Sequence, residues 1–231
     1  MSFKEIMTVL RGVGIAGIAV RLILAVICGG LIGLERESKR RAAGFRTHTL
    51  ICIGATLTTL VSQYMVSRGL NTDPARLGAQ VIAGMGFIGA GAIIVTSRRQ
   101  VKGLTTAAGL WTSAIIGLSI GTGFYEAALL AVCLVLIAEL FLSKFEYFIV
   151  STARSMNVYV EFSDPHDLDR IVEEMTAHNM SITDIEFTKS RTSVNSHPSA
   201  IFSVRFRKKM PHENVMALLS EIEGVMTVEE L

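Results

Sequence analysis

The sequence predicts a polytopic α-helical membrane domain followed by a soluble α+β domain of the ferredoxin-like type. The mean hydropathy is +0.48 and half of the residues are hydrophobic, which is too apolar for an ordinary soluble domain. Of the 20 glycines, 19 precede residue 124, where the long apolar runs also lie. Residues 1–154 carry 15 Lys and Arg against 7 Asp and Glu, whereas residues 155–231 carry 7 against 13. We therefore expect a membrane domain over 1–150 and a soluble domain over 155–231.

About five transmembrane helices are predicted, because five apolar segments approach the roughly 20 residues that cross a bilayer. The segments are Ile18–Leu34, Thr49–Val66, Leu77–Thr96, Leu104–Thr122 and Tyr125–Leu142. Only 13 residues separate Arg21 from Glu35 in the first segment, so we expect Arg21 to extend to one interface and Glu35 to lie near the other. Glu139 and Glu126 are expected to reach opposite interfaces in the same way. Residues Ser2–Gly14 are interpreted as a short interfacial helix.

Loop charges predict the orientation of these helices. Ten Lys and Arg lie on the side that holds the loops 35–48 and 97–103 and the segment after the fifth helix, and five lie on the other side. By the positive-inside rule, this bias places the N-terminus outside and the C-terminal domain in the cytoplasm.

After Arg154 the pattern changes to that of a small α+β domain. The alternation of Ala200–Arg207 is typical of a strand with one buried face, and Asp164 precedes Pro165 as a candidate helix N-cap. The predicted order βαββαβ describes a ferredoxin-like sandwich. Its elements are expected at Met156–Phe162, Pro165–His178, Ser181–Lys189, Ala200–Arg207, Pro211–Ile222 and Val225–Val228, with a polar loop at Ser190–Ser199.

Glycines inside proline-free apolar segments predict helices that pack backbone to backbone in lipid. The stretch Gly84–Gly89 matches the dinucleotide-binding pattern GxGxxG, but it follows no strand and lies within an apolar segment, so packing is the better interpretation. The pairs Gly29/Gly33 and Gly117/Gly121 support packing, and either pair is a candidate face for a homodimer. The helix-packing residues are predicted to be Gly29, Gly33, Gly44, Gly84, Gly86, Phe87, Gly89, Gly91, Gly117 and Gly121.

No catalytic constellation is present in the sequence. Walker A, HExxH, GxSxG and paired-carboxylate motifs are all missing, so we expect neither an enzyme nor a cofactor. The three cysteines lie in apolar segments without a CxxC and are interpreted as buried thiols. The basic run Arg205–Lys209 belongs to a domain of net charge −6, which argues against nucleic acid as a partner.

Polar residues that interrupt the helices are the candidate site. Glu35 is either an interfacial ion-pair partner of the basic loop or an inward-facing group that pairs with Arg46 or with a metal cation. Thr105 either caps the fourth helix or lines a polar cleft. Trp111 either fills a gap in the bundle or lines the same cleft. The candidate cleft comprises Glu35, Arg36, Arg46, Thr47, Arg76, Gln80, Thr105, Thr106 and Trp111.

Several strings, in this order and spacing, resemble the MgtC/SapB family of bacterial inner-membrane proteins over about residues 15–145. The strings are Gly30–Glu37, Ala43–His48, Asp73–Arg76, Gln80, Gly84–Gly91 and Lys102–Trp111. The C-terminal part resembles the ACT-like domain of many members, although Ser163–His166 forms no glycine-rich ligand loop. The resemblance implies a plasma-membrane protein linked to growth in low magnesium, to virulence and survival inside host cells, and to restraint of the F-type ATP synthase.

Two functions remain open from the residues. The favoured one is a non-enzymatic regulator that contacts other inner-membrane proteins, because catalytic groups are missing and charge is scarce deep in the bilayer. The alternative is a transporter or channel for a cation such as Mg²⁺. A Mg²⁺ path needs carboxylates or carbonyls and room for bound water, and only Glu35, Glu126 and Glu139 lie in or beside the spans.

Overall fold

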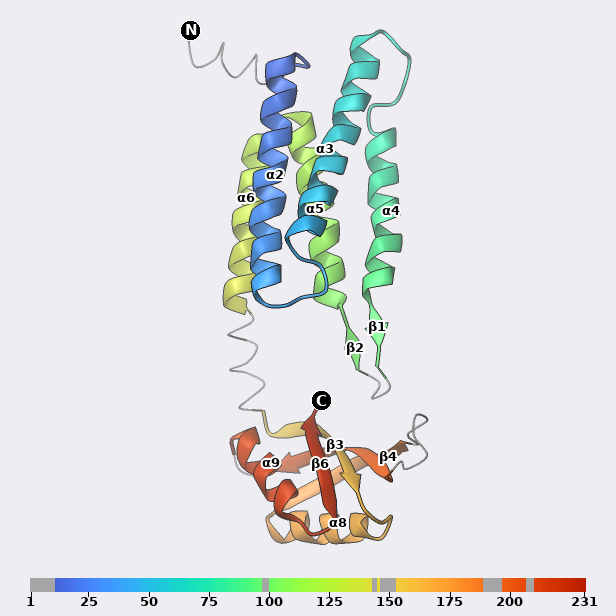
Figure 1. Cartoon of the computed structure of the whole chain (residues 1–231), viewed down its shortest axis with the longest axis vertical. Helices are drawn as coiled ribbons and strands as arrows, with labels where there is room; N and C mark the ends of the chain where they lie inside the picture. Colours follow the sequence, from blue (N-terminus) through green and yellow to red (C-terminus); the bar gives the residue numbers. More distant parts are fainter. Residues whose placement is uncertain (1–10, 97–99, 143–144, 146–152, 189–196, 207–209) are drawn as a thin grey trace. The chain divides into compact units, whose positions relative to one another are not determined.

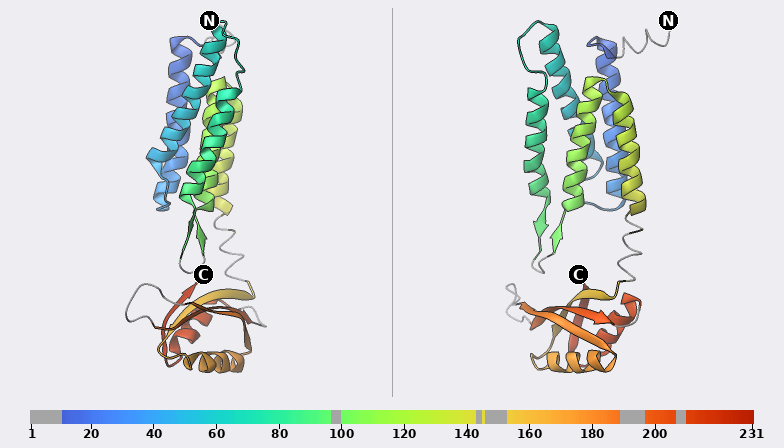
Figure 2. Two further views of the ribbon diagram at one scale, coloured as in Figure 1. Left: turned by 90° about the vertical axis from the view of Figure 1, so that its right-hand side faces the viewer. Right: turned by 180° about the vertical axis from the view of Figure 1, so that it is seen from behind.

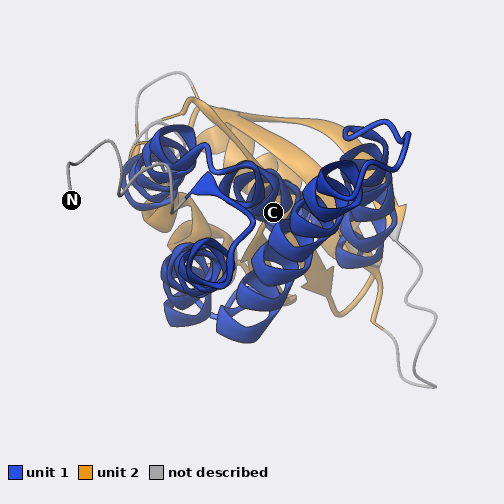
Figure 3. Cartoon of the chain, turned by 90° about the horizontal axis from the view of Figure 1, so that it is seen from above, with its two compact units in different colours: residues 1–95, 101–142 blue, residues 96–100, 143–231 orange. Residues whose placement is uncertain are grey.

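The computed structural model of the chain describes residues 11–96, 100–142, 145, 153–188, 197–206 and 210–231. It divides into two compact units, one formed by residues 1–95 and 101–142 and the other by residues 96–100 and 143–231 (Figure 3). Each unit is described by itself. The interfacial helix expected at Ser2–Gly14 falls mostly on residues outside the described ranges.

The first unit is a helical bundle (Figure 1). Its long helices are α2 (Ile15–Ser38), α3 (Phe45–Ser67), α5 (Leu104–Thr122) and α6 (Tyr125–Ile137), the last continuing as a π-helical turn, η1 (Ala138–Leu142). These four are long and apolar enough to cross a membrane. Helix α2 packs on α3, α3 packs on α5, and α6 packs on α5 and α2. The expected polytopic membrane domain is therefore confirmed.

Helix α4 (Arg76–Ala92) departs from the expected third span, Leu77–Thr96. Among the described residues, four helices meet the length and hydropathy of a membrane span, and α4, with 17 residues, is not one of them. It ends early because Ile93 turns extended and the chain forms a hairpin of β1 (Ile94–Val95) and β2 (Val101–Lys102). Gly103 then enters α5 with φ +96°, a left-handed conformation that disfavours any side chain.

Close helix contacts in the bundle depend on glycine. A Cβ built on Gly29 would lie 2.8 Å from Cys52 Cβ, and one on Gly33 would lie 2.6 Å from Phe45 Cα. On α5, a Cβ at Gly121 would lie 2.6 Å from Thr59 Cβ, and Gly117 is equally tight against α3. Both glycine pairs that were candidate dimer faces are therefore occupied by contacts within the chain.

Most glycines of α4 do not make the close helix contacts that the sequence predicts for them. A Cβ at Gly84, Gly86 or Gly91 would meet nothing within 4 Å, and Phe87 is 86% exposed. The prediction that these four residues pack against other helices is wrong for the chain by itself. Helix α4 lies at the edge of the bundle (Figure 2), packs mainly on α5, and buries only Met85 and Gly89.

The second unit has the expected ferredoxin-like order. Its elements are β3 (Ser155–Phe162), α8 (Asp167–Ala177), β4 (Met180–Thr188), β5 (Ser199–Phe206), α9 (His212–Glu221) and β6 (Val225–Glu230). The antiparallel sheet has the order β4-β5-β3-β6, with Val158 opposite Phe202 in the central pair. Most of the polar loop expected at Ser190–Ser199 lies outside the described residues.

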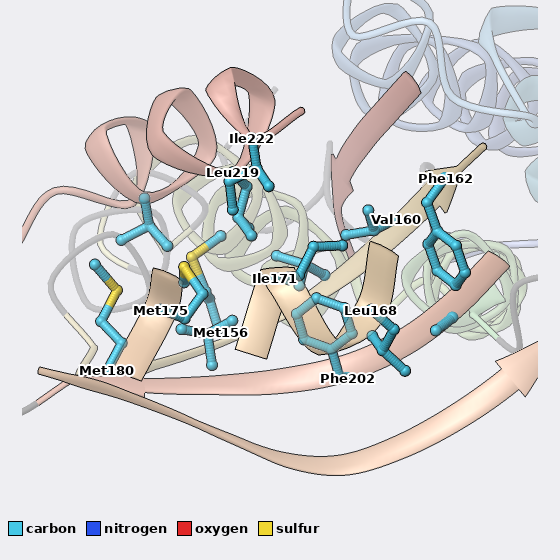
Figure 4. Packing of buried hydrophobic residues seen from close by; sticks show 14 of the residues in the cluster. Met156, Val160, Phe162, Leu168, Ile171, Met175, Met180, Phe202, Leu219 and Ile222 are labelled. Carbon is cyan, nitrogen blue, oxygen red and sulfur yellow. The ribbon is translucent and has the colours of Figure 1, made fainter. Parts of the chain in front are cut away.

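One face of this sheet and both helices form a single hydrophobic core (Figure 4). Val158 and Val160 of β3 and Phe202 of β5 meet Ile171 of α8 and Leu219 of α9. The alternation read in β5 is confirmed, because Phe202, Val204 and Phe206 are buried. The Asp164 N-cap is wrong: the helix begins at Asp167, and the Asp164 carboxylate accepts the amide of His166 in the preceding turn.

Candidate functional site

A buried arginine joins two helices at one end of the bundle. We call this the Arg36 end, where α2 ends and α3 and α5 begin. Arg36 Nε donates to Glu35 Oε2 at 2.6 Å, and Arg36 Nη2 lies 2.6 Å from Glu139 Oε2 on the π-helical turn after α6. The side chains of Arg36 and Glu35 are 2% and 7% exposed. Glu35, Arg36 and Glu139 are hereafter the Arg36 triad.

Lys39 completes the charge balance of the triad. Its Nζ lies 2.8 Å from Glu35 Oε1 and donates to the Glu139 carbonyl at 2.6 Å. Two cations therefore face two carboxylates, so the cluster is formally neutral. Removing a single partner from such a buried group leaves an uncompensated charge and typically costs about 3–5 kcal/mol.

The neighbouring carboxylate, Glu37, organises the turn into α3. Its Oε2 accepts the backbone N–H of Phe45 at 2.8 Å, which supplies one of the unsatisfied donors at the helix N-terminus. Gly44 lies directly against this side chain, since a Cβ at Gly44 would be 2.9 Å from Glu37 Oε2. The local sequence thus fixes the position of the loop that follows the triad.

The expected pair between Glu35 and Arg46 is wrong. Glu35 pairs with Arg36 and Lys39, while Arg46 is exposed in the first turn of α3. Arg36 follows Glu35 directly on α2 and lies next to Glu139. Its guanidinium therefore binds both carboxylates, and Arg46 does not. Arg40, Arg41 and Arg46 are all exposed at this end, and we call them the basic loop surface.

The structure does not gather the predicted cleft. Arg76 and Gln80 begin α4, which runs opposite to α5 across the β1-β2 hairpin, so they lie at the far end from Thr105 and Thr106 (Figure 1). Thr106 is buried, whereas Thr47 and Thr105 are exposed. Trp111 is 45% exposed, so its side chain does not fill a gap inside the bundle. Of the nine cleft residues, the triad brings together only Glu35 and Arg36.

A second buried arginine, Arg21, lies at the opposite end, where α2 begins and α6 starts. We expected Arg21 to extend to the membrane interface, but its side chain is fully buried. Its guanidinium donates to Gln63 Oε1 at 2.7 Å, to the Gly121 carbonyl at 2.9 Å, to the Arg11 carbonyl at 2.5 Å and to Tyr125 Oη at 3.3 Å. Four neutral acceptors satisfy the charge, which allows it to remain inside the bundle.

Sequence reasoning missed the roles of Glu139, Lys39 and Arg21. The sequence predicts that Glu139 reaches the interface, and the structure shows that it is bound by Arg36. A usable signal existed, because a carboxylate in an apolar segment predicts a cationic partner and the first and fifth segments end on the same side. Glu126, which was expected to do the same at the other end, pairs with Arg11.

The described residues contain no group of three or more His, Cys, Asp and Glu side chains that could hold a metal ion. Both oxygens of Glu35, the candidate metal ligand, lie against cationic nitrogens. The site is therefore a charge-balanced cluster of ion pairs that joins α2 to the end of α6.

Comparison with known proteins places this bundle in a family. The model of the MgtC family matches residues 22–148, which includes the whole triad. Protein SapB of Bacillus subtilis (strain 168) is 32% identical over 225 residues, covering 92% of this chain and 94% of SapB. YhiD of Escherichia coli (strain K12) is 46% identical over 128 residues, which cover 53% of this chain and 59% of YhiD. Protein MgtC of Salmonella typhimurium (strain LT2) is 40% identical over 123 residues, or 53% of this chain and 51% of MgtC.

For YhiD and MgtC, the matched region thus spans between half and three-fifths of the relative. No solved structure matches the chain. The family model covers more than half of the chain, and SapB aligns with nearly all of it. The chain is a membrane protein that belongs to the MgtC family.

Proposed function

We propose that this protein is a non-enzymatic regulator of bacterial inner-membrane physiology that acts through contacts with other membrane proteins. The observation that carries the proposal is the engagement of the bundle's carboxylates. Glu35 and Glu139 bind Arg36, Glu126 binds Arg11, and Glu37 binds the start of α3. A hydrated Mg²⁺ path needs free carboxylate or carbonyl oxygens, whereas cationic side chains occupy Glu35, Glu126 and Glu139, and a backbone N–H occupies Glu37.

The Arg36 end supplies the surface for such contacts. The triad and Lys39 hold α2 to the end of α6, and Glu37 fixes the loop into α3. The backbone beneath the basic loop surface is therefore held in place. Exposed guanidiniums on a fixed support suit recognition of carboxylates on a partner. The partner implied by the family resemblance is the F-type ATP synthase, and the resulting phenotypes are growth in low magnesium and intracellular survival.

A cation transporter is the second candidate, because YhiD carries the words magnesium transporter in its name. Flux in liposomes that contain only the purified protein separates the two functions. With a Mg²⁺-sensitive dye inside, we expect entry equal to that of protein-free liposomes, while an added ionophore gives the full signal. Protein-dependent Mg²⁺ entry that Glu35→Gln abolishes would overturn the regulator proposal.

The ATP synthase contact is tested in inverted membrane vesicles. We expect ATP-driven proton pumping to fall when the protein is present and to recover with Arg40→Ser, Arg41→Ser and Arg46→Ser combined. These side chains are exposed, so their replacement leaves the bundle folded. Pumping that is the same with and without the protein would exclude this partner.

We further propose that the C-terminal domain lies in the cytoplasm, on the basis of the ten-to-five bias of Lys and Arg. A single cysteine at the exposed position Ser220 tests this in intact cells. Cys133 is exposed, so the expectation of a buried thiol is wrong for it, and the background is Cys133→Ala; Cys28 and Cys52 are buried as expected. We expect no labelling by an impermeant thiol reagent until the cells are opened, and labelling from outside would reverse the orientation.

A further inference from the structure

The buried face of α3 is unusually polar for a membrane helix. His48, Thr56, Thr59 and Ser62 lie on it and are each at most 9% exposed. Inside a bilayer, no solvent is available to satisfy such groups, so each one needs a partner within the protein.

The hydroxyls on this face have partners. Thr56 Oγ1 donates to the Gly117 carbonyl of α5 at 2.8 Å, and Ser62 Oγ donates to the Pro74 carbonyl at 2.7 Å. Thr59 Oγ1 donates to the Ala55 carbonyl at 3.3 Å. These hydroxyls are therefore satisfied by backbone carbonyls of α3 and its neighbours.

Two side-chain atoms in fully buried residues of this interface remain without a hydrogen-bond partner among the described residues. They are His48 Nε2 on α3 and Ser113 Oγ on α5. Glu35 Oε1 also lacks hydrogen-bond geometry, but it is 2.8 Å from Lys39 Nζ and is satisfied as an ion pair. His48 lies in the first turn of α3, which is towards the Arg36 end, and Ser113 lies at the middle of α5.

The two atoms are chemically complementary. His48 Nδ1 lies 3.1 Å from the Gly44 carbonyl, which can only accept, so the proton of the neutral ring is on Nδ1. Nε2 is then an acceptor that needs a donor. The Ser113 hydroxyl carries a proton that has no acceptor.

The two atoms also point to the same turn of α5. A Cβ built on Gly109 would lie 3.5 Å from His48 Nε2. Ser113 follows Gly109 by one turn on the same face, where Cβ atoms are about 5–6 Å apart, and helical side chains lean towards the N-terminus. The Ser113 side chain thus leans towards the turn that Nε2 contacts, and a water molecule commonly bridges two polar groups placed in this way.

We propose that His48 and Ser113 form a binding site for one water molecule between α3 and α5. The water accepts the hydrogen bond of the Ser113 hydroxyl and donates to His48 Nε2, which satisfies both buried atoms. Gly109 makes room for it, because any side chain at this position would occupy the space beside the imidazole. The site links the two helices at a point that the contact between Thr56 and the Gly117 carbonyl does not reach.

Nitrogen-15 NMR of histidine-labelled protein in lipid nanodiscs tests the site, with His48→Gln assigning the signal among the five histidines. We expect a hydrogen-bonded Nε2 acceptor and a cross-peak from water to the His48 ring. Ser113→Ala and Gly109→Ala should each abolish the cross-peak, the first by removing the anchor and the second by filling the space. Ser119→Ala is the matched control, because Ser119 Oγ already donates to the Ile115 carbonyl within α5.

Thermal unfolding gives a second readout. If the water is bound, Ser113→Ala lowers the melting temperature more than Ser119→Ala does, since a satisfied hydroxyl is lost. If the site is dry, Ser113→Ala raises the melting temperature, because an unsatisfied buried hydroxyl is removed. A hydrogen-bonded Nε2 without a water cross-peak means that the serine binds the ring directly, and a non-bonded Nε2 means that the site is empty. Either result overturns the proposal.

Discussion

The two ends of the bundle each bury an arginine, and they hold its charge in different ways. At the Arg36 end, two carboxylates and a lysine make a neutral cluster. At the Arg21 end, an amide, two carbonyls and a phenol oxygen surround the guanidinium, with no carboxylate paired to it among the described residues. This membrane bundle thus retains one buried cation by opposite charge and the other by neutral dipoles. The two solutions respond differently to substitution.

The largest effect is expected at the Arg36 end. Arg36→Met leaves Glu35 and Glu139 buried and facing each other without their shared cation, which should cost about 3–5 kcal/mol of unfolding free energy. Unfolding in nanodiscs, followed by circular dichroism, measures this loss. A loss below about 1 kcal/mol would mean that the triad is a solvated surface contact.

The Arg21 end should be less sensitive. Arg21→Met leaves only neutral acceptors unsatisfied, and it also removes a buried charge without a counterion, so we expect a loss of about 2–3 kcal/mol. Gln63→Leu, which removes one acceptor and keeps the cation, serves as the companion variant. If Arg21→Met destabilises the bundle more than Arg36→Met, the distinction between the two ends is wrong.

Next to the triad, the close approach of α2 and α3 depends on Gly33. Gly33→Ala places a methyl 2.6 Å from Phe45 Cα, so the helices must separate, at a cost of about 1–2 kcal/mol. Gly84→Ala is the matched control, because its methyl meets nothing within 4 Å and alanine favours a helix. We expect the control to unfold at the same temperature as the wild type or slightly higher. Equal losses in both variants would exclude close packing as the cause.

The smallest effect is expected for the exposed pair of Arg11 and Glu126. Their side chains are 45% and 60% exposed, so Glu126→Gln should change the unfolding free energy by about 0–1 kcal/mol. High salt should remove even this difference, since screening weakens exposed ion pairs. A loss comparable to that of Arg36→Met would show that the two ends share one mechanism.

Much of the fold could be predicted from the sequence, because periodicity and length are local signals. The order βαββαβ and the apolar helices depend on such signals, and both are confirmed. Partner choice is not local. Glu35 binds Arg36 instead of Arg46 because α6 brings Glu139 to the same guanidinium, which no spacing along the chain shows. The burial of Arg21 could not be predicted either, because its four neutral acceptors come from segments up to 104 residues away in the sequence.

The glycines illustrate the same limit. Gly33 and Gly84 occupy similar apolar helices, yet one touches the backbone of α3 and the other faces open space. The difference arises because α4 is at the edge of the bundle and is covered mainly by α5. Glycine content therefore predicts that close packing occurs, while the position of each helix decides which glycines take part.

We propose that the Arg36 triad serves the function of the protein and does not only hold the fold together. A variant that combines Glu35→Gln, Arg36→Met and Glu139→Gln removes every charge of the triad at once. Only Lys39 of the cluster keeps its charge, and its side chain is 30% exposed, so the variant should unfold close to the wild type, unlike Arg36→Met alone. Arg11→Met combined with Glu126→Gln is the control that neutralises the exposed pair.

The test is growth in low magnesium. A deletion strain is complemented with each folded variant, and its growth is compared with that of the strain complemented with the wild type. We expect the control to restore growth and the neutralised triad to fail, although both reach the membrane in equal amounts. Full growth with the folded, neutralised triad would contradict the account and reduce the triad to a structural contact.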